Sequence, residues 1–481
     1  MADTEQLAEQ DLISFNGVNG STGEYLFPAV TPKGVAKVAQ GKDLDPDDTV
    51  YLSALKGRKD PHYGVIDAQA SKLNEAGWGI VINTEMANRQ EILEALEPLL
   101  QHREQHIIPG RFKKFSYIKH KDASPIDWLA RNGMAAGSVD PKVVPYYLLL
   151  IGSPEDIPFR FQFTLDVQYA VGRIHFETVA EYAIYAKQVV KREILNKPIN
   201  KQAVLFGVKN DADQATDYSI RYFIDPLHEK LRDKHSSPAG SWLIECIKEQ
   251  HASKSKLTSL LKQDQPPALI LTASHGMGFP VGDIRQATDQ GALLCSDWPG
   301  VDAWAYQPIP NEFYFSANDL NPSFNLNGMM LCLFACYSGG VPNKDHFNAT
   351  PDKQPAVISP TDTLSLLPKQ LLLAGASAVI AHIDRAWATS FLGELNTDNT
   401  NVFKGVIDML LAGLSVGHAM SYLNDYYATM ESAMSQLHDQ LREDPFANYS
   451  DKKIAKTYIG KVDARNYILI GDPATRLNKG D

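Results

Sequence analysis

The sequence predicts an α/β fold in which a mostly parallel β-sheet is covered by helices on both faces. Apolar strand segments alternate with helical segments from about residue 200 onward. The strand segments are apolar along their length, as in "ALILTAS" (268–274), which is typical of strands buried on both faces. The chain has 481 residues, of which 44% are hydrophobic, enough for two or three lobes with sizeable cores.

The first 200 residues predict an arm followed by an N-terminal α/β lobe. Residues 1–60 are polar and include the acidic run "KDLDPDDT", so we expect a loosely structured arm. Residues 61–200 contain the strand segment "GWGIVINT" (77–84) and an amphipathic helix over 89–106. A buried strand follows in "VVPYYLLLIGSPEDIP" (143–158) and ends in a Gly-Ser-Pro turn.

Residues 201–481 predict a second, larger α/β lobe, with regular alternation along the chain. Strands are expected at 203–209, 240–247, 268–274, 328–335, 376–384 and 466–477, and helices at 216–233, 254–263, 368–375 and over most of 402–443. The segment at about 280–310 interrupts this rhythm and is rich in Asp, Pro and aromatic residues. We interpret it as a long insertion beside a sheet edge, where such loops are usually functional lids or disordered.

Composition excludes several classes of function. The net charge of −11 and the pI of about 5.6 disfavour non-specific nucleic-acid binding, which needs basic residues to neutralise phosphates. No apolar run reaches the ~18 residues of a membrane span, and the acidic start of the chain lacks the pattern of a signal peptide. The four cysteines form no C-x-x-C pair, so we expect a cytoplasmic protein with free thiols.

Two apolar strands end on residues whose side chains can take part in catalysis. The segment "ALILTASHGMG" ends one strand on His275, and "GMMLCLFACYSGG" ends another on Cys336. Reactive groups gather at the carboxyl ends of parallel strands, so the two side chains can face each other if their strands are neighbours. That is the arrangement of a thiol nucleophile with an imidazole base. The N–H groups of Gly276 and Cys336 are then candidates for holding an oxyanion.

Each of these residues also has a structural interpretation. A single histidine at a strand end is usually a hydrogen-bonded structural residue, and a single cysteine in an apolar strand is usually core. Cys332, in mid-strand, is expected to be core. A zinc site is not expected, because Cys332 and Cys336 would lie about 13 Å apart along the strand. The pairing of His275 with Cys336, each before a turn of small residues, favours the catalytic interpretation.

The pairing resembles the caspase–gingipain group of cysteine peptidases, in which one apolar strand ends in His-Gly and a later one in a small residue and Cys. Further segments resemble gingipain-like enzymes in the same order along residues 145–481. These are "YYLLLIGSPEDIP" (146–158), "LDVQYAVGRI" (165–174), "AVIAHIDRAW" (378–387) and "ILIGDPATRL" (468–477). The resemblance implies a caspase-like fold and an endopeptidase that works through an acyl-enzyme.

The resemblance also implies roles for four residues. Cys336 matches the nucleophile and His275 the catalytic histidine. Asp166 matches the acid that binds an arginine side chain at the bottom of the specificity pocket, and Trp387 matches the wall of that pocket. From the residues alone, Asp166 could instead bond to a turn and Trp387 could be core. The implied activity is cleavage after a basic residue, with arginine preferred over lysine.

The chain departs from the family's pattern at three places. The segment at about 280–310 separates the catalytic pair, Ser153 replaces an aspartate, and no residue matches the glutamate that supports the histidine, so a third catalytic residue stays unassigned. No organic cofactor is implied, and structural calcium rests on the resemblance without a motif. The expected partner is a protein or peptide substrate, not nucleic acid or membrane. A catalytically silent interaction module and a peptidase of different specificity remain alternatives.

Overall fold

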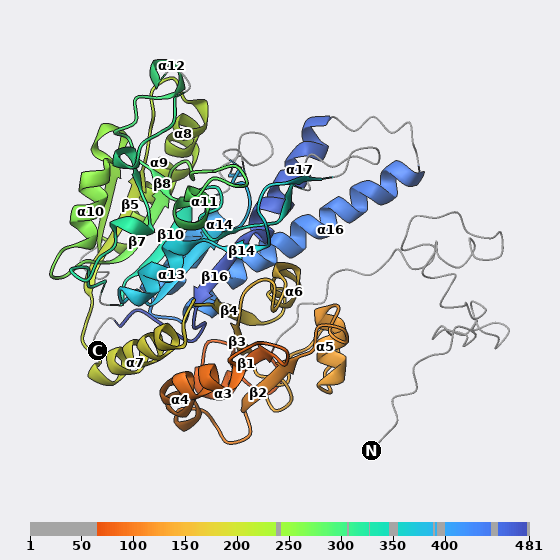
Figure 1. Cartoon of the computed structure of the whole chain (residues 1–481). Helices are drawn as coiled ribbons and strands as arrows, with labels where there is room; N and C mark the ends of the chain where they lie inside the picture. The colour runs from red at the N-terminus through yellow and green to blue at the C-terminus, as the bar shows by residue number, and fades with distance from the viewer. Residues whose placement is uncertain are drawn as a thin grey trace. The chain divides into compact units, whose positions relative to one another are not determined.

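The computed structural model describes residues 65–236, 242–304, 307–326, 328–345, 355–387, 390–391, 400–443 and 451–478 (Figure 1). The predicted arm at residues 1–60 lies outside the described residues. No helix in the described ranges is both long enough and apolar enough to pass through a membrane.

One ten-stranded sheet forms the centre of the described chain. Its strand order is β2-β1-β3-β4-β16-β15-β10-β7-β5-β6. In chain order these strands are β1 (Trp78–Asn83), β2 (Phe112–Tyr117), β3 (Tyr147–Ile151), β4 (Ala170–Ile174), β5 (Asn200–Gly207), β6 (Leu243–Lys248), β7 (Pro267–Ala273), β10 (Met330–Phe334), β15 (Ala378–His382) and β16 (Tyr467–Gly471). Three two-stranded ladders accompany the sheet: β8 (Leu293–Leu294) with β9 (Tyr314–Phe315), β11 (Gly340–Val341) with β14 (Thr363–Leu364), and β12 (Lys344–Asp345) with β13 (Ala356–Val357).

Helices connect and cover these strands. Those before β5 are α3 (Leu73–Ala76), α4 (Arg89–Gln105), α5 (Pro125–Arg131), α6 (Phe159–Leu165) and α7 (Val179–Leu195). Those after β5 are α8 (Gln214–Ser219), α9 (Asp225–His235), α10 (Lys254–Leu261), α11 (Arg285–Asp289), α12 (Val301–Trp304), α13 (Leu366–Leu373), α14 (Asn401–Leu411), α15 (Val416–Ala419), α16 (Ser421–Glu443) and α17 (Asp451–Arg465). A π-helical turn, Ile220–Ile224, joins α8 to α9, and short 3₁₀ turns lie at Glu249–His251, Asn311–Phe313 and Ala317–Asp319.

The sheet consists of two parallel halves that run in opposite directions. β2, β1, β3, β4 and β16 are parallel to one another, and so are β15, β10, β7, β5 and β6. The halves meet at β15 and β16, which pair antiparallel. The predicted N-terminal lobe supplies β1 to β4 and the predicted catalytic lobe supplies the rest. The lobe boundary near residue 200 stays a prediction, because both lobes contribute to one sheet.

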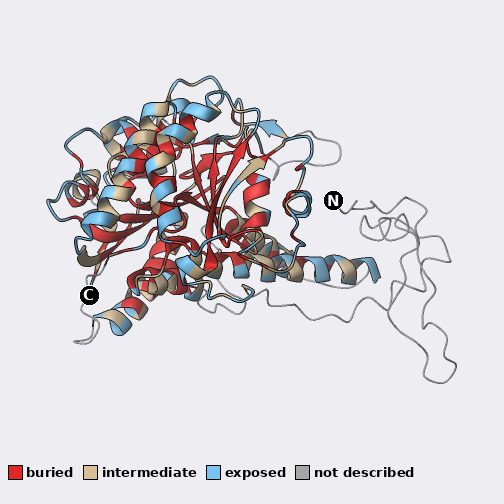
Figure 2. Ribbon diagram, turned by 90° about the horizontal axis from the view of Figure 1, so that it is seen from below, coloured by how far each residue is buried: buried red, intermediate tan, exposed pale blue. Residues whose placement is uncertain are grey.

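Both faces of the sheet are buried, as the apolar strands predicted (Figure 2). Alternate residues of β7 enter two different cores, with Ile270 on one face and Leu269 and Leu271 on the other. Leucines of α10 and α13 pack in the first core, and apolar residues of α9, α14 and α16 pack in the second. The sheet is therefore a rigid layer, and its strand ends hold the segments that follow them.

Candidate active site

His275 and Cys336 follow neighbouring parallel strands. β7 pairs with β10 in a register that places Ala273 opposite Phe334, and the Ser274 N–H continues the ladder by donating to the Phe334 carbonyl at 3.1 Å. The prediction that the two strands are neighbours is confirmed, and each residue lies two positions beyond the last register pair. A Cβ on Gly276 would collide with the carbonyl oxygen of Cys336, so the close approach of the two segments requires glycine there.

Asp213 contacts His275, although the sequence did not identify it as a candidate site residue. It follows β5, the other neighbour of β7, and caps the N-terminus of α8 by accepting the Ala215 N–H at 2.9 Å. Its Oδ2 is hydrogen-bonded to Nε2 of His275. Burial raises the pKa of Asp213, but the hydrogen bond and charge of His275, with the N–H groups of Ala215 and Thr216, lower the pKa overall. The reasoning about strand ends, applied to "VKNDADQ" after β5, points to both Asp211 and Asp213 and does not decide between them.

The Cys336 thiol lies in a largely desolvated setting. The Ala386 N–H donates to Sγ at 3.3 Å, and the thiol lies 3.7 Å from the Ala386 carbonyl. Burial raises the pKa of Cys336; the Ala386 N–H opposes this rise, and the nearby carboxylates of Asp384 and Asp463 add to it. The group is therefore a thiol at neutral pH and needs a base before it can attack.

Two backbone N–H groups beside the thiol are unused. Gly276 forms a β-bridge with Leu293, but the bonds of that bridge belong to its flanking residues: Met277 N–H donates to Ala292 and Leu294 N–H to His275. Within the described ranges, the N–H groups of Gly276 and Cys336 donate to no acceptor. Unpaired N–H groups beside a nucleophile are suited to hold developing negative charge on a substrate oxygen.

The turn after Cys336 is fixed to the end of β15. Tyr337 has a φ of 60°, in the left-handed region, and its N–H donates to the Asp384 carbonyl at 2.7 Å. The Gly339 N–H donates to the carbonyl of His382, a fully buried residue whose Nε2 lies 3.3 Å from Asp463. His382 thus holds the nucleophile segment in place, and this segment is fixed from both neighbouring strands.

The insertion at about 280–310 packs against the catalytic segments. It contains α11, β8 and α12, and it shares a small apolar core with the residues after His275, made of Met277, Phe279, Ala292, Leu294, Trp298 and Tyr314. Gly291 lies directly against the Tyr337 carbonyl, where a Cβ would collide. Asn210, on the loop that carries Asp213, donates to the carbonyls of Cys295 and Trp298 at 3.1 and 3.0 Å. The insertion therefore braces three of the segments around the site.

The two residues expected in a specificity pocket, Asp166 and Trp387, lie on the same sheet edge, and no hydrogen bond between them is found in the described residues. Trp387 directly follows Ala386, which touches the thiol, and its N–H donates to Asp463 at 2.9 Å. Asp166 ends α6 just before β4, whose start lies at the edge where β15 ends. Asp166 is buried with 6% exposure, and burial raises its pKa well above the usual value, partly opposed by the Val171 N–H and the charge of Arg173.

The "SPEDIP" segment after β3 forms a turn that Asp156 stabilises. Asp156 accepts hydrogen bonds from the N–H and the hydroxyl of Ser153. No group of three or more His, Cys, Asp or Glu side chains in the described ranges is arranged to hold a metal ion.

The family model for peptidase family C25 matches residues 80–478. The chain belongs to peptidase family C25. This confirms the resemblance to gingipain-like cysteine peptidases, and with it the caspase-like α/β fold and the class of enzyme. The chain is therefore a cysteine peptidase, and proteins or peptides are its substrates.

Two solved structures show distant similarity. One, described as "Structure of Protease", is 12% identical with a TM-score of 0.47, covering 84% of this chain and 79% of that chain. The other is the Saccharomyces cerevisiae separase–securin complex, 10% identical with a TM-score of 0.33, covering 69% of this chain and 16% of that chain. No curated protein matches the sequence.

Proposed function

We propose that this cysteine peptidase cleaves peptide bonds after a basic residue, arginine above lysine, with Cys336 as nucleophile and His275 as base. The observation that carries the proposal is the position of both residues at the ends of adjacent parallel strands, beside two unused N–H groups. The four cysteines are free thiols, which suits the cytoplasmic setting that we propose with it.

In the proposed reaction, His275 takes the proton of the Cys336 thiol and the thiolate attacks the scissile carbonyl carbon. The oxyanion that forms accepts hydrogen bonds from the N–H groups of Gly276 and Cys336. His275 then gives its proton to the leaving amine, and water hydrolyses the thioester. Because burial raises the pKa of the thiol, this base is needed at neutral pH.

Asp213 supports His275 in this scheme. Its carboxylate accepts the Nε2–H of the imidazole, which leaves Nδ1 as the nitrogen that can exchange a proton with the thiol. The negative charge also stabilises the imidazolium that forms during attack. Asp213 touches neither the thiol nor the substrate, so it acts as a positioning residue.

The nucleophile is tested by replacing Cys336 with alanine in the full chain. The variant should fold normally, lose turnover by ~10⁴ or more, and lose covalent labelling by an arginyl chloromethyl ketone. Peptide hydrolysis, mass-spectrometric mapping of the adduct and thermal melting measure these effects. Cys246→Ala, another partly exposed free cysteine, is the control and should keep full activity. An adduct on Cys295 would overturn the assignment.

Specificity is tested with a peptide library varied at the residue before the cut. A buried carboxylate needs a partner, and the planar guanidinium of arginine can satisfy both oxygens of Asp166 while its stem packs along Trp387. Asp166→Asn should lower kcat/KM for arginyl peptides by about 30-fold or more. Glu155→Gln, an exposed change nearby, should have no effect. A wild-type preference for Asp or a large apolar residue would contradict the proposal.

A further inference from the structure

A large groove lies at the sheet edge opposite Cys336 and His275. Its volume is about 1160 Å³, and it is bordered by the segments that precede β10 and β15, the segment that follows β16, and the C-terminal parts of α4 and α7. Since Cys336 and His275 follow β10 and β7, the groove and the candidate active site lie at opposite ends of the same strands. The groove is therefore separate from the site already described.

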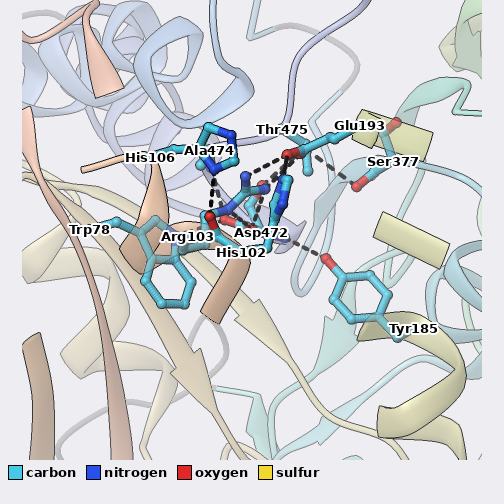
Figure 3. Close-up of polar contacts among 10 residues, drawn as sticks. All are labelled: Trp78, His102, Arg103, His106, Tyr185, Glu193, Ser377, Asp472, Ala474 and Thr475. Atoms are coloured by element: carbon cyan, nitrogen blue, oxygen red, sulfur yellow. Dashed lines mark hydrogen bonds and ion pairs between the residues drawn. The ribbon is translucent and has the colours of Figure 1, made fainter. Parts of the chain in front are cut away.

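The floor of the groove contains a charge network that is already balanced (Figure 3). Arg103 donates to both oxygens of Glu193 at 2.6 and 2.7 Å and to Asp472 at 2.8 Å. His102 also contacts Glu193, at 2.7 Å. Asp472 further accepts the Trp78 indole N–H at 2.9 Å. Glu193 and Asp472 are thus engaged with Arg103 and its neighbours.

The remaining cations of the groove have no such partner. Lys191, Arg192, Lys197 and Arg476 line it, and none of them forms an ion pair with a described carboxylate. Five lysine or arginine residues and a single glutamate line the groove in total, although the whole chain carries a net charge of −11. The groove is therefore a local positive field on an acidic protein, which attracts anions.

Two buried polar atoms on α7 also lack partners within the described ranges. They are Nη2 of Arg192, a donor, and Oε1 of Gln188, an acceptor whose amide is oriented by the bond from its Nε2 to the Leu373 carbonyl at 2.8 Å. Both residues line the groove. Buried polar atoms are normally satisfied, so this pair indicates a ligand that offers an acceptor and a donor at once.

We propose that the groove binds an acidic peptide segment of a partner protein. Carboxylates of the segment pair with Lys191, Arg192, Lys197 and Arg476, and a backbone N–H satisfies Gln188. Apolar side chains such as Leu195, Leu320 and Phe324 also line the groove and suit the apolar side chains of such a peptide. A small phosphate ligand fits less well, because the groove exceeds the roughly 300–1,000 Å³ typical of small-molecule pockets.

The test uses the full chain with Cys336→Ala, so that binding is measured apart from the proposed cleavage. The probe is a fluorescein-labelled peptide of alternating Asp and Leu, followed by fluorescence anisotropy, with Asn in place of Asp as the neutral comparison. The Asp peptide should bind and the Asn peptide should not. Adding Lys191→Glu and Arg476→Glu should weaken binding by about tenfold or more, and binding should weaken as salt rises.

The control is a pair of charge reversals outside the groove, Lys187→Glu on the same helix and Lys121→Glu, both exposed. This double control variant changes the net charge by the same amount as the groove variant, and it should change the affinity for the Asp peptide by less than about twofold. Lys197→Glu with Arg476→Glu provides a second groove variant, and thermal melting checks the fold of each. Absence of binding, equal losses in groove and control variants, or tight binding of pyrophosphate without binding of the peptide would each overturn the proposal.

Discussion

Cys336 is held in a site that keeps it protonated when no substrate is present. Burial and the carboxylates of Asp384 and Asp463 raise the pKa of its thiol, whereas the Ala386 N–H and the charge of Arg385 favour the thiolate. A resting thiol resists oxidation and alkylation, since only the thiolate reacts rapidly. Reactivity then depends on the imidazole of His275.

We predict that alkylation of Cys336 by iodoacetamide rises with pH only above the usual range of a cysteine pKa, about 8.5. The sign follows from the raised pKa: below it the group is a thiol, and the thiolate appears only as pH passes through it. Asp384→Asn removes a nearby negative charge and should shift the profile to lower pH. Asn tolerates the φ of 68° at this position. At pH 7.5 the alkylation rate should rise about two- to fivefold; an identical profile in both proteins would contradict this account.

The sequence could predict a site residue only where a local pattern marks its position. His275 and Cys336 each end an apolar strand of the sheet, so a pattern in the sequence marks their position. Asp213 is harder to find, because Asp211 in the same polar loop and Asp217 at the start of α8 look alike. Only the packing of β5 against β7 selects the one that reaches the imidazole.

The insertion at about 280–310 has its own small core and serves as a brace as well as a border of the site. Its contacts with Asn210 join it to the loop that carries Asp213, and its β-bridge joins it to Gly276. Composition could predict an insertion, but not this bracing, because the bonds are made by backbone carbonyls that any residue provides. Whether the insertion limits access of large substrates stays a prediction.

Asn210→Leu should loosen the insertion from the Asp213 loop. The change keeps the volume of the fully buried side chain but removes two hydrogen bonds, at a cost of about 1–3 kcal/mol in unfolding free energy. We expect kcat for a small arginyl peptide to fall several-fold and limited proteolysis within 280–304 to speed up. Asn132→Ala, which also removes an amide-to-carbonyl bond but lies directly after α5, should leave kcat unchanged. Equal kcat in both variants would argue against bracing.

The two oppositely directed halves of the sheet are joined at β15 and β16. Alternating apolar segments could predict the strands and the mostly parallel sheet. They could not predict where the direction reverses, because the pairing of β15 with β16 joins segments far apart in the sequence. Asp472, just after β16, binds Arg103 of α4 and Trp78 of β1, so the "GDP" segment connects the two predicted lobes.

Arg103→Met tests this connection. It leaves Asp472 fully buried without its cation and removes the main partner of Glu193, and breaking a buried pair in this way costs about 3–5 kcal/mol. Urea unfolding at pH 7 should show this loss. Arg442→Met, which breaks an exposed pair with Asp439, should cost less than about 1 kcal/mol.

The pH dependence of the same variant separates lost charge pairing from lost packing. Burial raises the pKa of Glu193. The charge of Arg103 and the hydrogen bonds that Glu193 accepts from His102 and Arg103 lower this pKa well below the usual 4.5. A lowered carboxyl pKa stabilises the fold fully above 4.5, and the stabilisation is lost as pH falls below that value. Wild type should therefore lose stability on acidification from pH 6 to pH 3, and Arg103→Met should lose less over the same interval. Parallel losses in the two proteins would show that Arg103 acts through packing alone.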